Sequence, residues 1–297
     1  MSSKVIVIVG PTAVGKTKIS IELAKQYGIE IISGDSIAIY RGLDIGSAKP
    51  TPEEMQQVPH HLIDICDPEE EYSVADFQRE ARSIITSKPL SIICGGTGLY
   101  IQAALMDYEF TPLKRDRNLE KTYESYTNEE LYLHLKQLDP AIDESKLHPN
   151  NRKRVLRAIE VIEETGTSIH SYQRKNVPLF DFFIAYLNLD RSLLYDRIHQ
   201  RVEQMFQEGL EKEAKGLYEK GLPLKGIGYQ EFIPYFEGRS TLEEVKETIK
   251  KNSRHLAKRQ ETWFKNQMDT HFYNVNLEDI FKTIEEIKKD IDGWLNV

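Results

Sequence analysis

A short glycine-rich segment limits what this chain can fold into more than any other feature. Residues Gly10 to Thr17 read GPTAVGKT and fit the pattern G-x-x-x-x-G-K-[ST] in full. The segment follows a β-branched run, Lys4 to Val9, and precedes residues with helical spacing through Tyr27. This is the strand, loop and helix context that the pattern requires, in which backbone N–H groups and a helix N-terminus surround a phosphate. The sequence therefore predicts a phosphate-binding P-loop.

Each residue of this loop is expected to bind a diphosphate. The predicted diphosphate-binding set is Gly10, Pro11, Thr12, Ala13, Val14, Gly15, Lys16 and Thr17. Lys16 can neutralise phosphate oxygens, and the Thr17 hydroxyl can hold Mg²⁺, the expected cofactor. The pattern alone does not say which molecule carries the phosphates.

Three further apolar runs indicate the rest of the sheet. They are Ile29 to Ile32, Leu90 to Cys94 and Phe182 to Leu189. Strands that alternate with helices favour a parallel sheet. The predicted fold class is α/β, with a P-loop-type parallel sheet flanked by helices.

The segment between Asp107 and Pro149 lacks such runs and is charged and helical in pattern. Thr127 to Glu130 has the form of a capping box, and leucines follow at helical spacing until Asp139. We interpret residues 107–149 as a helical insertion domain in a catalytic core made of residues 1–106 and 150–297. Within that core, helices are predicted from about Asn150 to Gly166, Ser192 to Lys220 and Thr241 to Asn266.

Composition excludes several classes of protein. The apolar runs are far shorter than the roughly 20 residues that cross a bilayer, and no secretory signal is recognisable. Two cysteines, Cys66 and Cys94, provide neither a disulfide framework nor a four-thiolate zinc site. We therefore expect a cytoplasmic protein without membrane contact. The net charge of −8 means that a polyanionic partner has to be bound by local basic surfaces.

Two more loops follow predicted strands and should meet the P-loop at one edge of the sheet. Asp35 and Ser36 follow the second strand, and Gly95-Gly96-Thr97-Gly98 follows the third. Open α/β sheets bind ligands at this edge. Asp35 is the candidate general base or outer magnesium group, although a turn or N-cap role is an equally good interpretation. The glycines favour close backbone approach, or form only a tight turn.

The combination of motifs resembles one enzyme family, the tRNA dimethylallyltransferases or isopentenyl-tRNA transferases. The similarity runs from residue 4 to about 265. The motifs that carry it are GPTAVGKT at 10–17, Asp35-Ser36 with Tyr40, DIGSAKP at 44–50, HHLID at 60–64, GGTGLY at 95–100, GIGYQE at 226–231 and AKRQETWF at 257–264. Many members of the family carry glutamine where this chain has Ala38.

The resemblance implies transfer of a dimethylallyl group from dimethylallyl diphosphate to N6 of adenosine 37 in the tRNA anticodon loop, with release of diphosphate. It implies Asp35 as the base and Lys16, Thr12 and Arg201 as groups that stabilise the leaving diphosphate. Arg197, one turn from Arg201, is the less favoured arginine. The tRNA-binding residues implied around the site are Asp35, Ser36, Ile37, Ala38 and Thr97.

Two basic clusters could hold RNA. Arg152, Arg154 and Arg157 lie at the start of a predicted helix, where cations are unfavourable for the helix dipole. Lys250, Arg254 and Lys258 form a stripe at i, i+4 spacing on a later helix, in a stretch with seven Lys and Arg against two Glu. Both clusters are predicted to contact tRNA phosphates. For the first cluster, the alternative is a solvated face with ion pairs.

Three other functions stay open on sequence grounds. They are prenyl transfer to a free adenine nucleotide, phosphoryl transfer by an ATP-dependent P-loop kinase, and a non-enzymatic nucleotide switch. The basic helix and the insertion favour tRNA over a free nucleotide. A monomer is expected.

Overall fold

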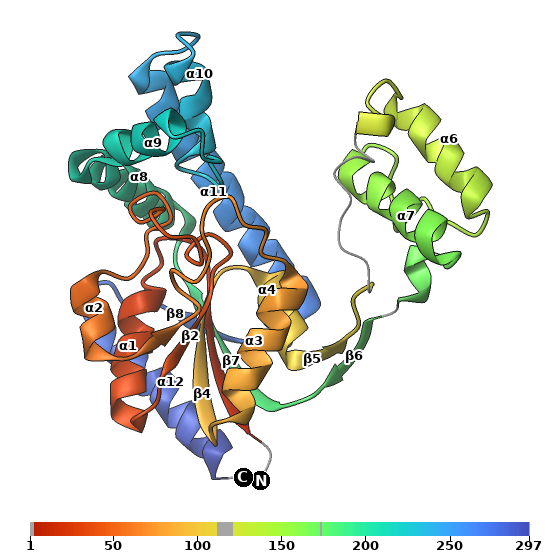
Figure 1. The fold of residues 1–297 in the computed structure, drawn as a ribbon. Helices are drawn as coiled ribbons and strands as arrows, with labels where there is room; N and C mark the ends of the chain where they lie inside the picture. The colour runs from red at the N-terminus through yellow and green to blue at the C-terminus, as the bar shows by residue number, and fades with distance from the viewer. Residues whose placement is uncertain (1–2, 112–120, 173, 297) are drawn as a thin grey trace. The chain divides into compact units, whose positions relative to one another are not determined.

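The computed structural model describes residues 3–111, 121–172 and 174–296. The chain forms two compact units (Figure 1). Unit 1 comprises Met1–Met106 and Pro178–Val297, and unit 2 comprises Asp107–Val177. Among the described residues, no helix combines the length and the apolar character that crossing a membrane demands.

A six-stranded parallel sheet forms the centre of unit 1, as the sequence predicts. Its order is β3-β2-β4-β1-β7-β8, so β1 and its neighbour β4 lie in the middle. The strands are β1 (Lys4–Val9), β2 (Ile31–Gly34), β3 (His60–His61), β4 (Leu90–Gly95), β7 (Asp181–Asn188) and β8 (His271–Asn274). The P-loop therefore begins at the central strand, where connections leave toward both halves of the sheet.

The alternation of side chains along β1 builds an apolar core on each face of the sheet. Ile6 and Ile8 pack with α1 (Lys16–Tyr27) and α12 (Ile280–Leu295) on one face. Val5, Val7 and Val9 pack on the other face with α3 (Val74–Thr86), α4 (Gly98–Leu105) and the end of α11 (Leu242–Gln267). All five β1 side chains are fully buried. Each contributes about 1.5 to 3 kcal/mol to stability by burial, which fixes the strand that carries the P-loop.

A third apolar cluster lies among the remaining helices of unit 1. It involves α8 (Arg191–Glu208), α9 (Leu210–Glu219), η2 (Gln230–Phe232), α10 (Ile233–Phe236) and the first half of α11. The prediction of one helical stretch from Ser192 to Lys220 was wrong at Gly209. This residue has a φ of 102° and ends α8 in a left-handed conformation, from which α9 starts again. A short helix, α2 (Pro52–Gln57), follows the β2 loop.

Unit 2 corrects the predicted end of the insertion. Its helices α6 (Asn128–Leu138) and α7 (Arg152–Thr165) pack through Leu131, Leu135, Val155 and Ile159. The predicted core boundary at residue 150 was wrong, because the apolar face of α7 is buried against α6 in this unit. The unit also contains η1 (Ile169–Ser171) and most of a two-stranded sheet of β5 (Met106–Tyr108) and β6 (Arg174–Pro178), whose end residues Met106 and Pro178 belong to unit 1. The predicted capping box at Thr127 and Glu130 is confirmed.

Candidate functional site

The three predicted loops meet at the carboxyl ends of β1, β2 and β4. Gly34 and Gly95 are paired neighbours in β2 and β4. A Cβ atom on Gly95 would lie 2.3 Å from the Gly34 carbonyl oxygen, so the two strand ends approach closely only because Gly95 has no side chain. This contact brings the loops that follow the two strands together, beside the P-loop.

The P-loop has the strained backbone that a phosphate cradle needs. Gly10 and Gly15 have φ values of 150° and 110°, and Ala13, with a φ of 67°, is left-handed despite its side chain. Such a conformation costs a non-glycine residue about 1 to 2 kcal/mol, so the surrounding fold must hold it in place. Lys16 extends back over the loop, where its Nζ donates to the carbonyls of Gly10 at 3.0 Å and Pro11 at 2.9 Å.

Two partly buried cations lie beside this loop. The pKa of Lys16 is lowered from its ordinary 10.5 to about 8, mainly by burial and in smaller part by nearby Arg201, while Cys94 and Asp35 oppose the shift. Burial also lowers the pKa of Arg201, and Asp35 again opposes the change. Two cations that have lost most of their hydration form an environment that favours a multiply charged anion.

The two candidate arginines contact different parts of the P-loop. Arg201 donates from Nη1 to the Thr12 hydroxyl and from Nη2 to the Ala48 carbonyl, both at 3.4 Å. Arg197 donates from Nε to the Ala13 carbonyl at 2.8 Å. This geometry favours Arg201 for anion binding, because Arg197 is engaged with the loop backbone. Thr12, itself a residue of the loop, is thus the loop side chain that Arg201 contacts.

Asp35 has the turn role that its position in the sequence allows, and this role occupies only one of its two carboxylate oxygens. Its Oδ1 accepts hydrogen bonds from the N–H groups of Ile37 at 2.8 Å and Ala38 at 3.3 Å, which is a turn role. Its Oδ2 has no hydrogen-bond partner among the residues that the structure describes. One carboxylate oxygen therefore holds the loop, while the other can accept a proton.

The other residues predicted around Asp35 are Ser36, Ile37, Ala38 and Thr97, and only Ser36 and Thr97 are joined by a hydrogen bond. Ser36 donates from its backbone N–H to the Thr97 hydroxyl at 3.2 Å, which joins the β2 and β4 loops. Ile37 is half-buried, and Ala38 is only 3% exposed. The Ala38 side chain is thus part of the protein interior.

Sequence reasoning missed the function of Gln260 on α11. Its Oε1 accepts from the Thr12 N–H at 3.0 Å, and its Nε2 donates to the Gly96 carbonyl at 3.1 Å. Gly96 and Gly98 accommodate α11 closely, since a Cβ atom there would lie 2.2 Å from Gln260 and 2.1 Å from Trp263 respectively. Only the resemblance, through the motif at 257–264, marks this residue in the sequence.

The residues present fit a magnesium ion bound together with a diphosphate. Thr17 is the second residue of α1, next to Lys16, and its hydroxyl is an oxygen donor of the kind that Mg²⁺ prefers. Mg²⁺ is usually held by one or two protein groups together with phosphate oxygens and water. Thr17 is the residue that would hold such an ion.

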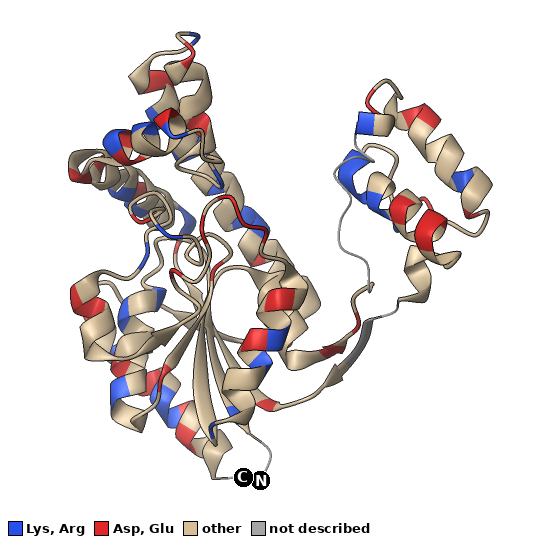
Figure 2. Cartoon of the chain, in the orientation of Figure 1, with Lys and Arg blue, Asp and Glu red and all other residues tan. Residues whose placement is uncertain are grey.

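Basic residues recur along α11 (Figure 2). The side chains of the predicted stripe divide into those engaged with other residues and those that are exposed without an ion pair to any described residue, called open here. Lys250 forms ion pairs of 2.7 Å with both Glu203 and Glu247, and its side chain is only 12% exposed. Arg254 contacts His199. Lys258 is exposed and has no ion-pair partner among the described residues, and the same holds for the neighbouring Lys251, His255 and Arg259.

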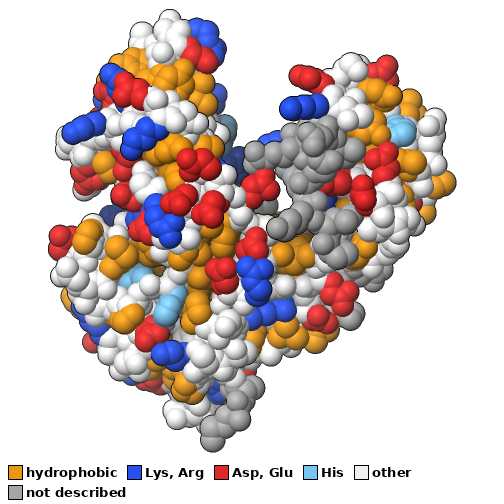
Figure 3. Space-filling view, in the orientation of Figure 1, with side chains coloured by type: hydrophobic (Ala, Val, Ile, Leu, Met, Phe, Trp, Pro, Cys, Tyr) orange, Lys and Arg blue, Asp and Glu red, His pale blue; other side chains and the backbone are white. Residues whose placement is uncertain are grey.

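The cluster on α7 divides in the same way. Arg152 donates to the backbone carbonyls of Tyr123 and Tyr126, which packs it within unit 2. Arg157 pairs with the buried Glu160 and contacts Thr111. Arg154 is exposed, without an ion pair to any residue in the described part of the chain. Figure 3 shows acidic and basic side chains interspersed over the visible surface. The described basic side chains on this face therefore do not merge into one large basic surface.

Two protein-family models match this chain. The model described as IPP transferase matches residues 38–267, and the model described as isopentenyl transferase matches residues 3–66. The chain belongs to the IPP transferase family. The matched region includes residues of both units and all of α11, with Gln260.

Individual relatives support the same family over the full length. A tRNA dimethylallyltransferase of Enterococcus faecalis is 47% identical, with 98% of this chain and 97% of the relative covered. One of Anoxybacillus flavithermus is 45% identical, with 99% and 97% covered. These IPP transferase relatives confirm the resemblance that the sequence motifs indicate.

Two solved structures share the fold. A tRNA isopentenylpyrophosphate transferase of Bacillus halodurans has a TM-score of 0.76 and 44% identity, with 99% of this chain and 97% of that chain covered. A eukaryotic dimethylallyltransferase described as acting on tRNA has a TM-score of 0.79 and 30% identity, with 92% and 74% covered. The α/β architecture is thus the architecture of the IPP transferase family.

Because the pKa of Lys16 is lowered in the folded chain, the free energy of unfolding should depend on pH. Below about pH 8 it is charged in the folded and the unfolded chain, so the destabilisation from burying its charge is present in full. Between about pH 8 and 10.5 the unfolded chain binds more protons, so the free energy of unfolding rises with pH. Relative to Lys16→Met, which cannot ionise, the wild-type protein should gain roughly 2 to 3 kcal/mol over this range.

Urea unfolding of both proteins at a series of pH values measures this gain. A difference between the two proteins that does not change with pH would show that the pKa of Lys16 is not lowered.

Proposed function

We propose that this chain transfers a dimethylallyl group from dimethylallyl diphosphate to N6 of adenosine 37 in the tRNA anticodon loop and releases diphosphate. The observation that carries the proposal is the pair of partly buried cations, Lys16 and Arg201, at a P-loop close enough to Asp35 for its charge to affect both. Oδ1 of Asp35 is bound in a turn, and its Oδ2 has no hydrogen-bond partner among the described residues. The names of the relatives, which specify tRNA and dimethylallyl transfer, support the substrates.

The leaving group accounts for the P-loop. As the bond between the allylic carbon and oxygen breaks, its electron pair moves to the diphosphate, and negative charge builds there. Backbone N–H groups of the loop, Lys16 and Arg201 bind that charge more strongly in the transition state than in the ground state, which is what accelerates the reaction. Because the two cations are already desolvated, their attraction for the departing anion is strong.

The nucleophile accounts for Asp35. The N6 amine of adenine attacks the allylic carbon with its lone pair, forms the new carbon–nitrogen bond and then carries an excess proton. Asp35 accepts that proton through Oδ2, since Oδ1 is engaged with the turn. An exocyclic amine is a weak nucleophile, so orientation supplies much of the rate. An anticodon-loop base leaves its stack more easily than a duplex base.

Magnesium is the expected cofactor of this reaction. When bound, it would neutralise part of the charge on the diphosphate, and Thr17 is the residue that would hold it. A cytoplasmic location and a monomeric enzyme remain predictions from the sequence.

The two other enzymatic functions make different use of the same loop. A kinase would transfer a phosphoryl group from ATP, and a nucleotide prenyltransferase would accept AMP or ATP in place of tRNA. The relatives favour neither, because their names specify tRNA. The open cations of both units also favour a long polyanion over a free nucleotide.

Product analysis discriminates among these functions. Purified protein is incubated with dimethylallyl diphosphate and Mg²⁺ in the presence of tRNA, AMP or ATP, and the products are identified by mass spectrometry. We expect prenylated adenosine only with tRNA, and loss of the reaction when EDTA removes the metal. Modified AMP or ATP, or a product that forms equally well in EDTA, would contradict the proposal.

Asp35→Asn should remove the proposed role of Asp35 as a base while keeping its hydrogen bonds to the turn. The side-chain oxygen of the introduced amide would still accept the N–H groups of Ile37 and Ala38, but the amide cannot take up a proton at neutral pH. Turnover should fall by roughly 10²- to 10⁴-fold, with tRNA affinity changed less than about twofold. Asp269→Asn, at an exposed position after α11, is the control. Turnover like that of the wild type would remove Asp35 from the role of base.

Single substitutions should distinguish open cations from engaged ones. We expect Lys258→Ala on α11, and Arg154→Ala on α7, each to lower tRNA affinity and to reduce the slope of log K against log salt by about 1. Lys250→Ala should leave the slope unchanged, because its charge is already paired. Filter binding over a range of salt concentrations gives these slopes. Equal slopes for all three variants would mean that the open cations contribute no more to tRNA binding than the paired one does, and that both helices present solvated faces.

A further inference from the structure

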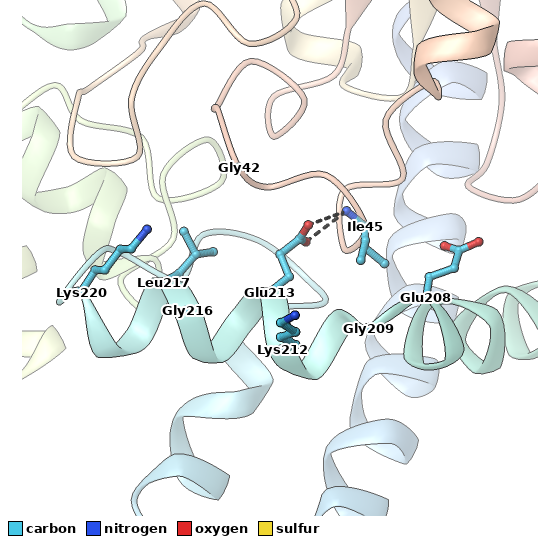
Figure 4. A pocket seen from close by; sticks show the side chains of 9 residues that line it. All are labelled: Gly42, Ile45, Glu208, Gly209, Lys212, Glu213, Gly216, Leu217 and Lys220. Carbon is cyan, nitrogen blue, oxygen red and sulfur yellow. Dashed lines mark hydrogen bonds between the residues drawn. The ribbon is translucent and has the colours of Figure 1, made fainter.

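Glu213 on α9 binds a turn of the chain that carries no assigned function. Its carboxylate accepts hydrogen bonds from three successive backbone N–H groups, those of Asp44 at 3.2 Å, Ile45 at 3.0 Å and Gly46 at 3.3 Å. Figure 4 shows Glu213 directed from α9 at Ile45. Both residues line a surface pocket of about 370 Å³. Convergent backbone N–H groups form an anion site, and here the anion is a side chain of the protein itself.

Tyr229 fixes the same turn from a second direction. Its hydroxyl donates to Glu213 Oε1 at 2.6 Å and accepts from the Gly46 N–H at 3.0 Å. Burial and the hydrogen bond to Glu213 raise the pKa of Tyr229, so the hydroxyl stays a donor. A Cβ atom on Gly46 would lie 2.6 Å from the Tyr229 ring. The start of the turn is therefore held tightly by two side chains.

The other end of the turn contacts Arg201. The Ala48 N–H donates to the Ile45 carbonyl at 3.0 Å, and Ala48 has a left-handed φ of 53°. The Ala48 carbonyl then accepts from Arg201 Nη2, while Nη1 donates to the Thr12 hydroxyl. Glu213 is thus connected to Arg201 through a turn of five residues, Asp44 to Ala48.

Arg201 depends on this carbonyl for its orientation. Its guanidinium forms no ion pair with any described residue, and its two hydrogen-bond partners, Thr12 and Ala48, are uncharged. Glu213 and Arg201 lie on α9 and α8, which meet at Gly209. The two helices consequently hold opposite ends of one turn.

We propose that Glu213 is a positioning residue for diphosphate release: by holding the Asp44–Ala48 turn, it places the Ala48 carbonyl that orients Arg201 toward the P-loop. This proposal rests on the proposed function for the identity of the anion. The effect of Glu213 on catalysis is indirect, since it contacts neither Thr12 nor Lys16.

Glu213→Gln tests the proposal. The amide keeps the side chain's size but loses the charge. Its oxygen can still accept hydrogen bonds, but its NH₂ group cannot, so the backbone N–H groups bound by one of the two carboxylate oxygens lose their acceptor. We expect the single-turnover rate of dimethylallyl transfer to fall roughly 10- to 100-fold, with tRNA affinity within about twofold of the wild-type value. Affinity for inorganic pyrophosphate with Mg²⁺, measured by calorimetry, should fall about fivefold or more.

A double-mutant cycle with Arg201→Ala separates positioning from general stability. If Glu213 acts through Arg201, adding Glu213→Gln to Arg201→Ala should change the rate and the pyrophosphate affinity by less than about twofold. The proposal would be overturned if the effects of Glu213→Gln and Arg201→Ala were independent, so that the double variant shows the product of the two fold-changes. It would also be overturned if Glu213→Gln alone matched the wild-type protein in both rate and pyrophosphate affinity. Thermal unfolding of each variant confirms that it is folded under the assay conditions.

Glu211→Gln is the matched control on the same helix. Glu211 also accepts a hydrogen bond from a tyrosine, Tyr235 at 3.0 Å, but does not contact the turn. It should retain wild-type rate and pyrophosphate affinity. If the wild-type protein binds pyrophosphate but transfers no dimethylallyl group, the proposed function fails, and the cycle in pyrophosphate affinity still decides the role of Glu213.

Discussion

The burial of two like charges beside one loop is the constraint on which the rest of unit 1 depends. Lys16 and Arg201 lie next to each other at the P-loop, and the pKa of each is lowered by its loss of hydration. Their hydrogen bonds are to uncharged groups, namely the carbonyls of the loop, the Ala48 carbonyl and the Thr12 hydroxyl. Such an arrangement is unfavourable by itself, and Asp35 offsets only part of it through its field. A bound diphosphate would relieve it, so the free energy stored in folding becomes affinity for the anion.

Several distant segments share the task of holding this unfavourable geometry. β1, which is fully buried from Val5 to Val9, fixes the start of the loop. Arg197 binds the Ala13 carbonyl, and Gln260 binds the Thr12 N–H from α11. Glu213 and Tyr229 do the same for the turn that meets Arg201. A strained loop persists only where its surroundings over-determine it, which explains why helices far apart in the sequence converge on a few backbone atoms.

The sequence predicted those parts of the structure that are determined locally. The P-loop and the strands β1, β2, β4 and β7 follow from short apolar runs and a fixed motif, and the capping box at Thr127 needs only neighbouring residues. The end of the insertion was not predictable in this way, because the amphipathic pattern of α7 does not say which core it faces. Residues 271–295, which form β8 and α12, were not predicted. Gln260 and Glu213 act over separations of 248 and 168 residues, for which a single sequence has no signal.

A count of basic residues in the sequence does not show which of them are available to bind RNA. In the sequence, Lys250, Arg254 and Lys258 form a single stripe, yet Lys250 compensates the charge of two glutamates and Arg254 packs on His199. The same division separates Arg154 from Arg152 and Arg157 on α7. A paired cation releases no counterions when it meets a phosphate backbone, so it contributes little to binding RNA. An acidic protein that binds RNA therefore depends on those few cations that its fold has left without partners, and their number, more than the local charge count, sets how steeply binding varies with salt.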